Sequence, residues 1–183
     1  MPIFGDMKKI ITVFCFSLFA TAAFCQAITK MKITDVEKYI TTSVDDVLVI
    51  SFWATFCKSC VAEIPSFISI TNKYKSSHVK LLLVSLDLPS YYPAKIAAFA
   101  NKHHFNTNIA WLNETNADYF CPRIDSSWSG SIPATLIINT KTGYRKFFED
   151  EIKASQFEKE LNKAIIGKTV SSSDHYIDSS APE

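Results

Sequence analysis

The sequence lacks a net charge of either sign and any internal repeat. Its 183 residues contain 19 Lys and Arg against 18 Asp and Glu, a formal charge of +1 at pH 7. A balance of this kind gives no electrostatic reason to expect nucleic acid as a partner. The length, together with an apolar content of 48%, indicates one ordinary domain with a full hydrophobic core.

Metal-ligand patterns are also scarce. The chain has one Cys-x-x-Cys pair, Cys57 and Cys60, and neither a second such pair nor a well-spaced His pair follows it. His103 and His104 are adjacent, so their side chains would point in different directions on a helix. We therefore expect no metal site and no cofactor.

The apolar run near the N-terminus is shorter than the roughly 20 residues that a membrane-spanning helix needs. It extends from Ile10 to Phe24, follows the basic start Met7-Lys8-Lys9 and ends at Cys25-Gln26. This pattern is typical of a secretory signal peptide and predicts residues 1–25 as a cleaved leader of a periplasmic or otherwise exported protein. Two alternatives stay open, because the run could remain as a membrane anchor or Cys25 could be lipidated.

Cleavage would leave three of the five cysteines, namely Cys57, Cys60 and Cys121. An odd number in an exported protein is not a structural disulfide framework. The close pair and the leftover cysteine instead predict a redox pair with a spare thiol. Cys121 is then either a third redox thiol or, as we favour, a buried and inert cysteine.

Hydrophobic patterns divide the chain into strands and helices. Apolar runs of strand length, the last one paired through the turn at 140–143, predict strands at 47–53, 79–88, 108–112, 135–138 and 144–148. Apolar residues at helical spacing predict helices at 33–40, 57–75, 93–104 and 154–166. Thr34 or Asp35 is expected to cap the first helix, and 117–130 is expected to form a helical turn and a loop. This order predicts an α/β domain at 28–166, with a central mixed sheet and helices on both faces, and a disordered polar tail at 167–183.

Cys57 stands directly after a predicted buried strand and at the start of a predicted helix. A thiol in this position lies at the positive end of the helix dipole, beside backbone N–H groups without helical partners. Both features favour the thiolate, so Cys57 is expected to be acidic and nucleophilic. Cys60 follows one turn later and can reach back to close a disulfide. The pattern predicts dithiol–disulfide exchange.

Two motifs carry a resemblance to a known fold family. They are Trp53-x-x-x-Cys57-x-x-Cys60 with Pro65 behind it, and Ile132-Pro133-Ala134-Thr135 leading into a strand. Together they resemble the thioredoxin fold. More narrowly, Phe52-Trp53-Ala54-Thr55 and Cys60-x-x-Glu63-x-Pro65 resemble the exported TlpA/ResA-like thiol–disulfide oxidoreductases. The similarity covers roughly residues 30–166.

The resemblance implies a role for the residues of both motifs. Cys57 is expected to attack and form a mixed disulfide with the substrate, which Cys60 then resolves. The Ile132–Pro133 bond is expected to be cis and to lie beside the dithiol. The Ile132 backbone can then pair with an extended substrate segment as an added strand.

Two tryptophans border these motifs. The resemblance implies that Trp53 packs as a lid beside the dithiol and the bound substrate, and a plain core aromatic is the alternative. Trp128, five residues before Pro133, either lines the substrate surface or anchors its loop.

Ser51 stands where thioredoxins carry a buried aspartate as proton acceptor for the second cysteine. A serine cannot be that base near neutral pH. Glu63 is the replacement candidate, because it lies three residues after Cys60 on the same helix face and ResA-like proteins have a functional carboxylate there. The alternative is an ordinary solvated helix glutamate.

The direction of electron flow stays open between two residues. Lys58 adds positive charge beside Cys57, which favours the thiolate and therefore an oxidant. Ile132 instead resembles the residue before the cis-proline of reducing thioredoxins. We favour a monomeric reductase that exchanges disulfides with exported proteins and takes electrons from a membrane thiol-transfer protein.

Two rival functions fit the residues less well. A peroxiredoxin needs Pro and Thr seven and three residues before its cysteine, where this chain has Ile50 and Ala54. A non-catalytic thioredoxin-like module that binds a periplasmic client is the second alternative, although both cysteines are intact.

Overall fold

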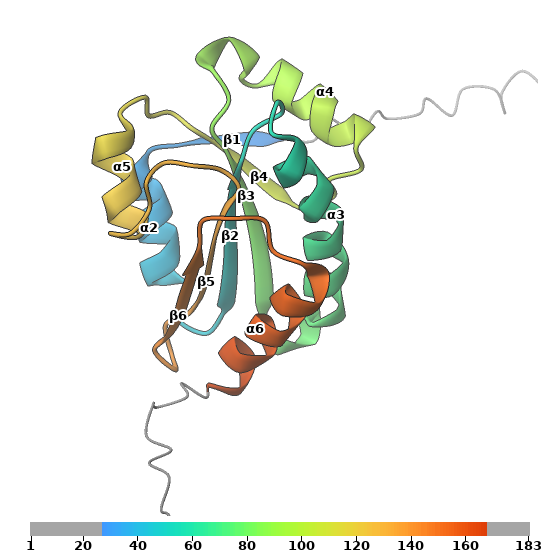
Figure 1. Ribbon diagram of the computed structural model, residues 1–183, viewed down its shortest axis with the longest axis vertical. Coiled ribbons are helices and arrows are strands. Elements are labelled where there is room, and N and C mark those ends of the chain that lie inside the picture. Colours follow the sequence, from blue (N-terminus) through green and yellow to red (C-terminus); the bar gives the residue numbers. More distant parts are fainter. Residues whose placement is uncertain (1–26, 168–183) are drawn as a thin grey trace, which may run out of the picture.

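The computed structural model describes residues 27–167 (Figure 1). The predicted leader at 1–25 lies outside this range, and so does the tail predicted at 167–183 except for Gly167, which is the C-cap of α6. The described part of the chain forms a six-stranded sheet in the order β1-β4-β3-β2-β5-β6. Its strands are β1 (Ile28–Met31), β2 (Val47–Trp53), β3 (Val79–Ser85), β4 (Asn108–Leu112), β5 (Ala134–Asn139) and β6 (Tyr144–Phe148).

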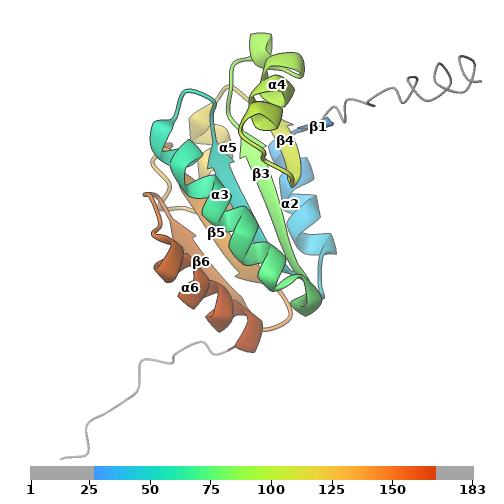
Figure 2. The same ribbon diagram turned by 90° about the vertical axis from the view of Figure 1, so that its right-hand side faces the viewer.

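Helices cover both faces of this sheet (Figure 2). One face packs against α3, α4 and α6, and the other against α2 and α5. The α/β architecture predicted from the sequence is confirmed. The helices are α2 (Ile33–Thr42), α3 (Lys58–Lys73), α4 (Ala94–Lys102), α5 (Ala117–Ile124) and α6 (Ala154–Ile166), with 3₁₀ turns η1 (Lys75–Ser77) and η2 (Pro89–Tyr91). None of the helices in the described range has both the length and the apolar character that crossing a membrane requires.

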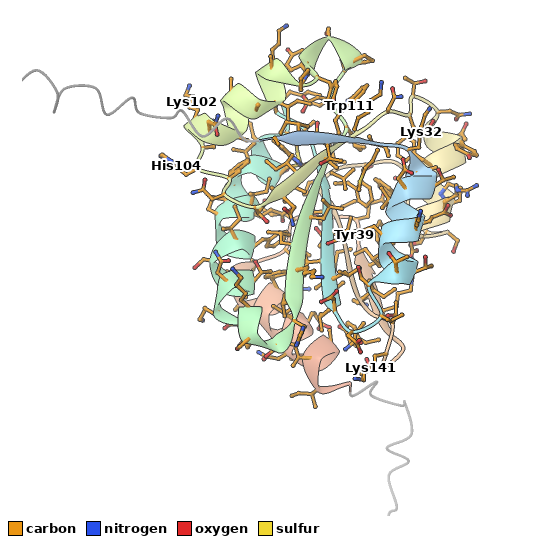
Figure 3. All side chains as sticks on the ribbon, turned by 180° about the vertical axis from the view of Figure 1, so that it is seen from behind. Lys32, Tyr39, Lys102, His104, Trp111 and Lys141 are labelled. Carbon is orange, nitrogen blue, oxygen red and sulfur yellow. A yellow bond between two sulfur atoms is a disulfide. The ribbon has the colours of Figure 1, made fainter. Side chains whose placement is uncertain are left out.

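The sheet is mixed, as the sequence predicts. Strands β1, β4, β3 and β2 run parallel to their neighbours, while β5 is antiparallel to β2 and forms a hairpin with β6. The edge strand β1 has no counterpart among the predicted strands. Lys30 of β1 lies 5.6 Å from the ring of Trp111 on β4, which Figure 3 labels at this edge.

The continuous apolar run of β2 follows from its central position. Its residues alternate between the two core clusters, so that Val49 and Trp53 face α3 while Ile50 and Phe52 face α2 and α5. Both faces are covered, and every residue of the strand is buried. The buried central strand therefore gives the N-terminus of α3 a rigid surface to pack against.

The first helix is capped differently from the prediction. Its N-cap is Lys32, not Thr34 or Asp35. The carboxylate of Asp35 instead reaches back and accepts the backbone N–H of Lys32 at 2.8 Å. Asp35 thus satisfies the unpaired N–H of the N-cap from inside the first turn of the helix. The prediction placed the N-cap at such a residue and not before it.

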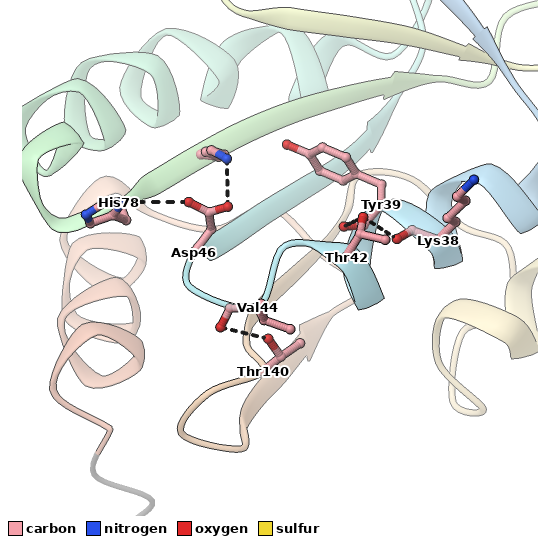
Figure 4. Close-up of polar contacts among 8 residues, drawn as sticks. Lys38, Tyr39, Thr42, Val44, Asp46, His78 and Thr140 are labelled. Atoms are coloured by element: carbon pink, nitrogen blue, oxygen red, sulfur yellow. Dashed lines mark hydrogen bonds and ion pairs between the residues drawn. The ribbon is translucent and has the colours of Figure 1, made fainter.

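A small polar cluster closes the end of the sheet where β2 begins (Figure 4). Asp46 accepts a hydrogen bond from Nζ of Lys80 at 2.6 Å, and Nδ1 of His78 lies 4.0 Å from the same carboxylate. The Thr140 hydroxyl donates to the carbonyl oxygen of Val44 at 3.4 Å. The opposite end of β2 leads into the Cys-x-x-Cys motif.

Candidate active site

The two cysteines of the motif form a disulfide at the N-terminus of α3. Cys57 is the N-cap of the helix, and its Sγ accepts the backbone N–H of Cys60 at 3.3 Å. The Cα atoms of the pair lie 5.3 Å apart. Both sulfurs are thus committed to each other, and residues 27–167 contain no group of three His, Cys, Asp or Glu side chains placed to hold a metal. The arrangement is suited to two-electron thiol–disulfide chemistry.

The two sulfur-bearing residues differ in their access to solvent. Cys57 keeps 9% of its surface exposed, whereas Cys60 is fully buried. An incoming thiolate or disulfide can therefore reach Cys57 only. Phe56, directly before it, is 71% exposed and places an apolar surface beside the reactive sulfur.

Asp87 fixes the loop that carries Cys57. Its buried carboxylate accepts hydrogen bonds from the Thr55 hydroxyl group at 2.6 Å and from the Thr55 backbone N–H at 3.1 Å. The carboxylate also accepts a hydrogen bond from the Ser85 hydroxyl group at 2.8 Å. The backbone carbonyl oxygen of Asp87 accepts a hydrogen bond from the indole N–H of Trp111. The sequence analysis missed this residue. It stood inside the strand predicted at 79–88, but β3 ends at Ser85, which leaves Asp87 at the carboxyl ends of the parallel strands, where sites of α/β sheets lie.

Pro133 lies at the same end of the sheet as the disulfide. The Ile132–Pro133 peptide bond is cis, as predicted. The pairing of Phe52 with Ala134 between β2 and β5 puts Pro133 level with Trp53, where the loop to Cys57 starts. Pro133 is buried and Ile132 is half-buried, so the backbone between them borders the surface near the dithiol.

Trp53 is buried in the core on the α3 face of the sheet. Its side chain has no exposed surface and packs against the rings of Phe105 and Phe99, with centroids 5.5 and 6.0 Å away. The absence of exposed surface favours the core-aromatic alternative over a substrate-contacting lid. Trp128 is also buried, and its Nε1 donates to the carbonyl oxygen of Ser131 at 2.9 Å, which favours the loop-anchoring interpretation.

Glu63 is buried under α3, with 4% of its surface exposed. The alternative of a solvated helix glutamate is therefore wrong. Burial raises the pKa of Glu63 from 4.5 to about 7; the Ile152 hydrogen bond opposes the rise, and the charges of Glu151 and Asp150 add to it. A carboxyl group with such a pKa can exchange a proton near neutral pH. It lies one turn after Cys60, on the same side of the helix.

Further polar atoms without partners lie on the same face of the sheet as α3. Among the described residues, Oγ of Ser51, Oγ1 of Thr135 and Oε1 of Glu63 are buried and make no hydrogen bond. Ser51 and Thr135 are directly paired across β2 and β5. Ser51 thus lies on the same face of the sheet as the disulfide and Glu63, where its hydroxyl group has no hydrogen-bond partner.

Cys121 lies on the other face of the sheet. It is the free cysteine of the described range, is 3% exposed and belongs to the core cluster of α2 and α5. Burial raises the pKa of its thiol to about 11. Both features agree with the expectation of an inert cysteine.

Comparisons with known proteins agree with this geometry. Residues 19–143 match the AhpC/TSA family. A thiol:disulfide interchange protein of Chlorobium tepidum has the same fold at 14% identity, with a TM-score of 0.57 over 68% of this chain and 83% of that one. A thioredoxin-related protein of Neisseria meningitidis serogroup B is 24% identical, with a TM-score of 0.53 over 66% and 82%. A secreted disulfide oxidoreductase of Mycobacterium tuberculosis is 15% identical, with a TM-score of 0.51 over 67% and 84%.

No curated protein sequence matches the chain. The structural neighbours confirm the thioredoxin fold that the motifs predict. They share it at 14–24% sequence identity, a likeness that shows the fold alone.

Proposed function

This chain belongs to the AhpC/TSA family and is a thioredoxin-like thiol–disulfide oxidoreductase, and from that premise we propose that it reduces disulfides of exported proteins in the cell envelope. The observation that carries the proposal is the asymmetry of the Cys57–Cys60 pair, one partly exposed and one fully buried at a helix N-terminus. Ile50 and Ala54 stand where a peroxiredoxin needs Pro and Thr, so peroxide is not the proposed substrate.

The reaction starts from the reduced dithiol. The Cys57 thiolate attacks one sulfur of a substrate disulfide, forms a mixed disulfide and releases the other sulfur as a thiolate. Cys60 then gives its proton to Glu63 and attacks the Cys57 sulfur. This step closes the Cys57–Cys60 disulfide and releases the second substrate sulfur. Two electrons have then passed from the enzyme to the substrate.

The reductive direction is proposed on Ile132, which resembles the residue before the cis-proline of reducing thioredoxins, and Glu63 supports the resolving step by Cys60. A buried second cysteine resolves a mixed disulfide only after it loses its proton, and a carboxylate one turn away can accept that proton. In the reverse reaction Cys60 is the leaving group and the protonated Glu63 returns the proton, so Glu63 serves exchange in both directions. The exposed Lys58 beside Cys57 favours an oxidant instead. The reduction potential of the Cys57–Cys60 pair therefore has to be measured.

The cellular setting is part of the proposal. The apolar run at 10–24 supports export, and one neighbour of the same fold is described as secreted. Each turnover leaves the enzyme oxidised, so a reductase needs a dithiol donor that returns two electrons and two protons. A membrane thiol-transfer protein would supply them to a monomeric enzyme.

Turnover of insulin disulfides with dithiothreitol as electron donor tests the proposal. We expect wild type and Cys121→Ser to be equally active and Cys57→Ser to be inactive. Equal inactivity of wild type and Cys57→Ser would instead favour a non-catalytic binding module. The reduction potential of the pair decides the direction, since roughly −270 mV indicates a reductase and roughly −120 mV an oxidase.

A further inference from the structure

The connection between β6 and α6 begins with Glu149, whose carboxylate is hydrogen-bonded to the loop before the cis-proline Pro133. One carboxylate oxygen of Glu149 accepts the backbone N–H groups of Ser129 at 2.8 Å and Ser131 at 3.0 Å, and the hydroxyl of Ser129. Trp128 holds the Ser131 carbonyl from the other side. Ser131 is two residues from Pro133, so these bonds shape the approach to the proposed substrate edge.

The same connection ends at the proposed proton acceptor. The backbone N–H of Ile152, three residues after Glu149, donates to Oε2 of Glu63 at 2.9 Å. Figure 1 shows the connection crossing from β6 at the edge of the sheet to α6, which packs against α3. The stacked rings of Phe67 and Phe157, 4.2 Å apart, hold these two helices together.

We propose that residues 149–152 form a strap that positions both parts of the active site at once. Glu149 at one end holds the loop that leads to the cis-proline, and Ile152 at the other end holds the Glu63 carboxyl group. A change in the position of the substrate edge is then transmitted to the acid–base residue through three peptide units. The inference rests on the proposed function, because it assigns Glu149 as a positioning residue for that reaction.

The two middle residues of the strap supply charge. Asp150 and Glu151 are exposed carboxylates that raise the pKa of Glu63 beyond the effect of its burial. Cys60, one turn earlier on the same helix, is held in the disulfide and carries no charge. No Lys, Arg or His in the described part of the chain forms an ion pair with Glu63. The strap therefore contributes both the hydrogen bond and the charges that act on this carboxyl group.

Removal of the Glu149 carboxylate tests whether residues 149–152 act as a strap. Glu149→Ala should raise KM for insulin at least about fivefold, since it deletes the acceptor of several hydrogen bonds that hold the loop before Pro133. In the same variant the Glu63 hydrogen bond should loosen, so the pKa of Glu63 should rise by about half a unit in carboxyl ¹³C NMR. Glu149→Gln keeps an acceptor oxygen, so its KM and its Glu63 pKa should both lie close to the wild-type values.

The matched control is Glu158→Ala. Glu158 of α6 is also a hydrogen-bonded glutamate, paired with Lys73 and Tyr74 at the C-terminal end of α3, far along the helix from Cys60. Its removal should change neither KM nor the pKa of Glu63. A double variant, Asp150→Asn with Glu151→Gln, should lower the pKa of Glu63 by about half a unit and leave KM unchanged, because it removes only charge.

An unchanged Glu63 pKa in Glu149→Ala would overturn the strap, and so would an equal shift in Glu158→Ala. If Glu149→Ala does not fold, the double variant and Glu149→Gln decide the question through the same NMR titration. That titration needs no turnover. Failure of the proposed function, seen as an inactive wild type, is therefore separable from failure of the strap.

Discussion

The backbone N–H of Ile152 donates a hydrogen bond to Oε2 of Glu63, while Oε1 of the same buried carboxyl group has no hydrogen-bond partner among the described residues. One bond is too few for an ionised carboxylate taken out of water. The group is therefore held between its two protonation states near neutral pH.

The first prediction concerns the pH dependence of stability. The pKa of Glu63 in the fold, about 7, lies above its ordinary 4.5, so its contribution is fully present below about pH 4.5 and is lost as the pH rises through 7. Glu63→Gln removes this loss and should be more stable than wild type at pH 8 by up to roughly 3 kcal/mol, and about equally stable at pH 5. Urea unfolding of the oxidised protein at both pH values measures the difference. Parallel wild-type and variant curves would contradict the prediction, and the control Glu158→Gln should show no gain at pH 8.

The second prediction concerns the same substitution in catalysis. Glutamine cannot accept the Cys60 proton, so Glu63→Gln should slow resolution of a preformed Cys57 mixed disulfide by roughly 10²-fold. The wild-type rate should rise with pH through about 7, and the variant should lose this step. Single-turnover release of a chromophoric thiol measures resolution, and attack by Cys57 on the same reagent is the internal control. An unchanged pH–rate profile would falsify the proton-transfer role.

The third prediction compares two aspartates at opposite ends of β2. Asp87→Ala leaves the Thr55 N–H and two hydroxyl groups without their acceptor and should lower the free energy of unfolding by about 2–4 kcal/mol. It should also change the alkylation rate of Cys57, whose loop it holds. Asp46→Ala removes an ion pair with the half-exposed Lys80, should cost about 1 kcal/mol or less, and should leave Cys57 unaffected (Figure 4). Equal effects of both variants on Cys57 would show that Asp87 acts only through general stability.

The fourth prediction concerns Cys121. A thiol with a pKa of about 11 holds on the order of one hundredth of the thiolate of an ordinary cysteine at pH 8. In the reduced native protein, iodoacetamide should therefore label Cys57 and leave Cys121 unmodified, whereas unfolding in urea should make both react. Mass spectrometry of the labelled peptides distinguishes the sites. Rapid native labelling of Cys121 would contradict its assignment as inert.

The parts of the fold that the sequence predicts well are those with strong local patterns. The bounds of β2, β4 and α6 match the predictions, because a strand buried on both faces is continuously apolar and an amphipathic helix ending at Gly167 shows its period and its stop. β1 was missed because it is a short edge strand with one buried residue in four. Its position depends on pairing with β4, far along the chain.

The candidate site divides in the same way. Cys57, Cys60 and the cis bond before Pro133 follow from motifs of a few adjacent residues. Asp87 and Glu149 bond to partners 32 and 20 positions away, and no spacing in the sequence connects them. The burial of Trp53 is equally non-local, since it depends on the contact with Phe99 of α4.

The position of Cys121 behind the sheet has a consequence for covalent fidelity. Three cysteines in the described range permit three pairings, and two of them would require a sulfur to pass through a close-packed layer of strands. The sheet thus insulates the exchanging pair from the spare thiol. However often the dithiol cycles, the folded chain returns to one oxidised isomer, and scrambling is confined to molecules that have unfolded.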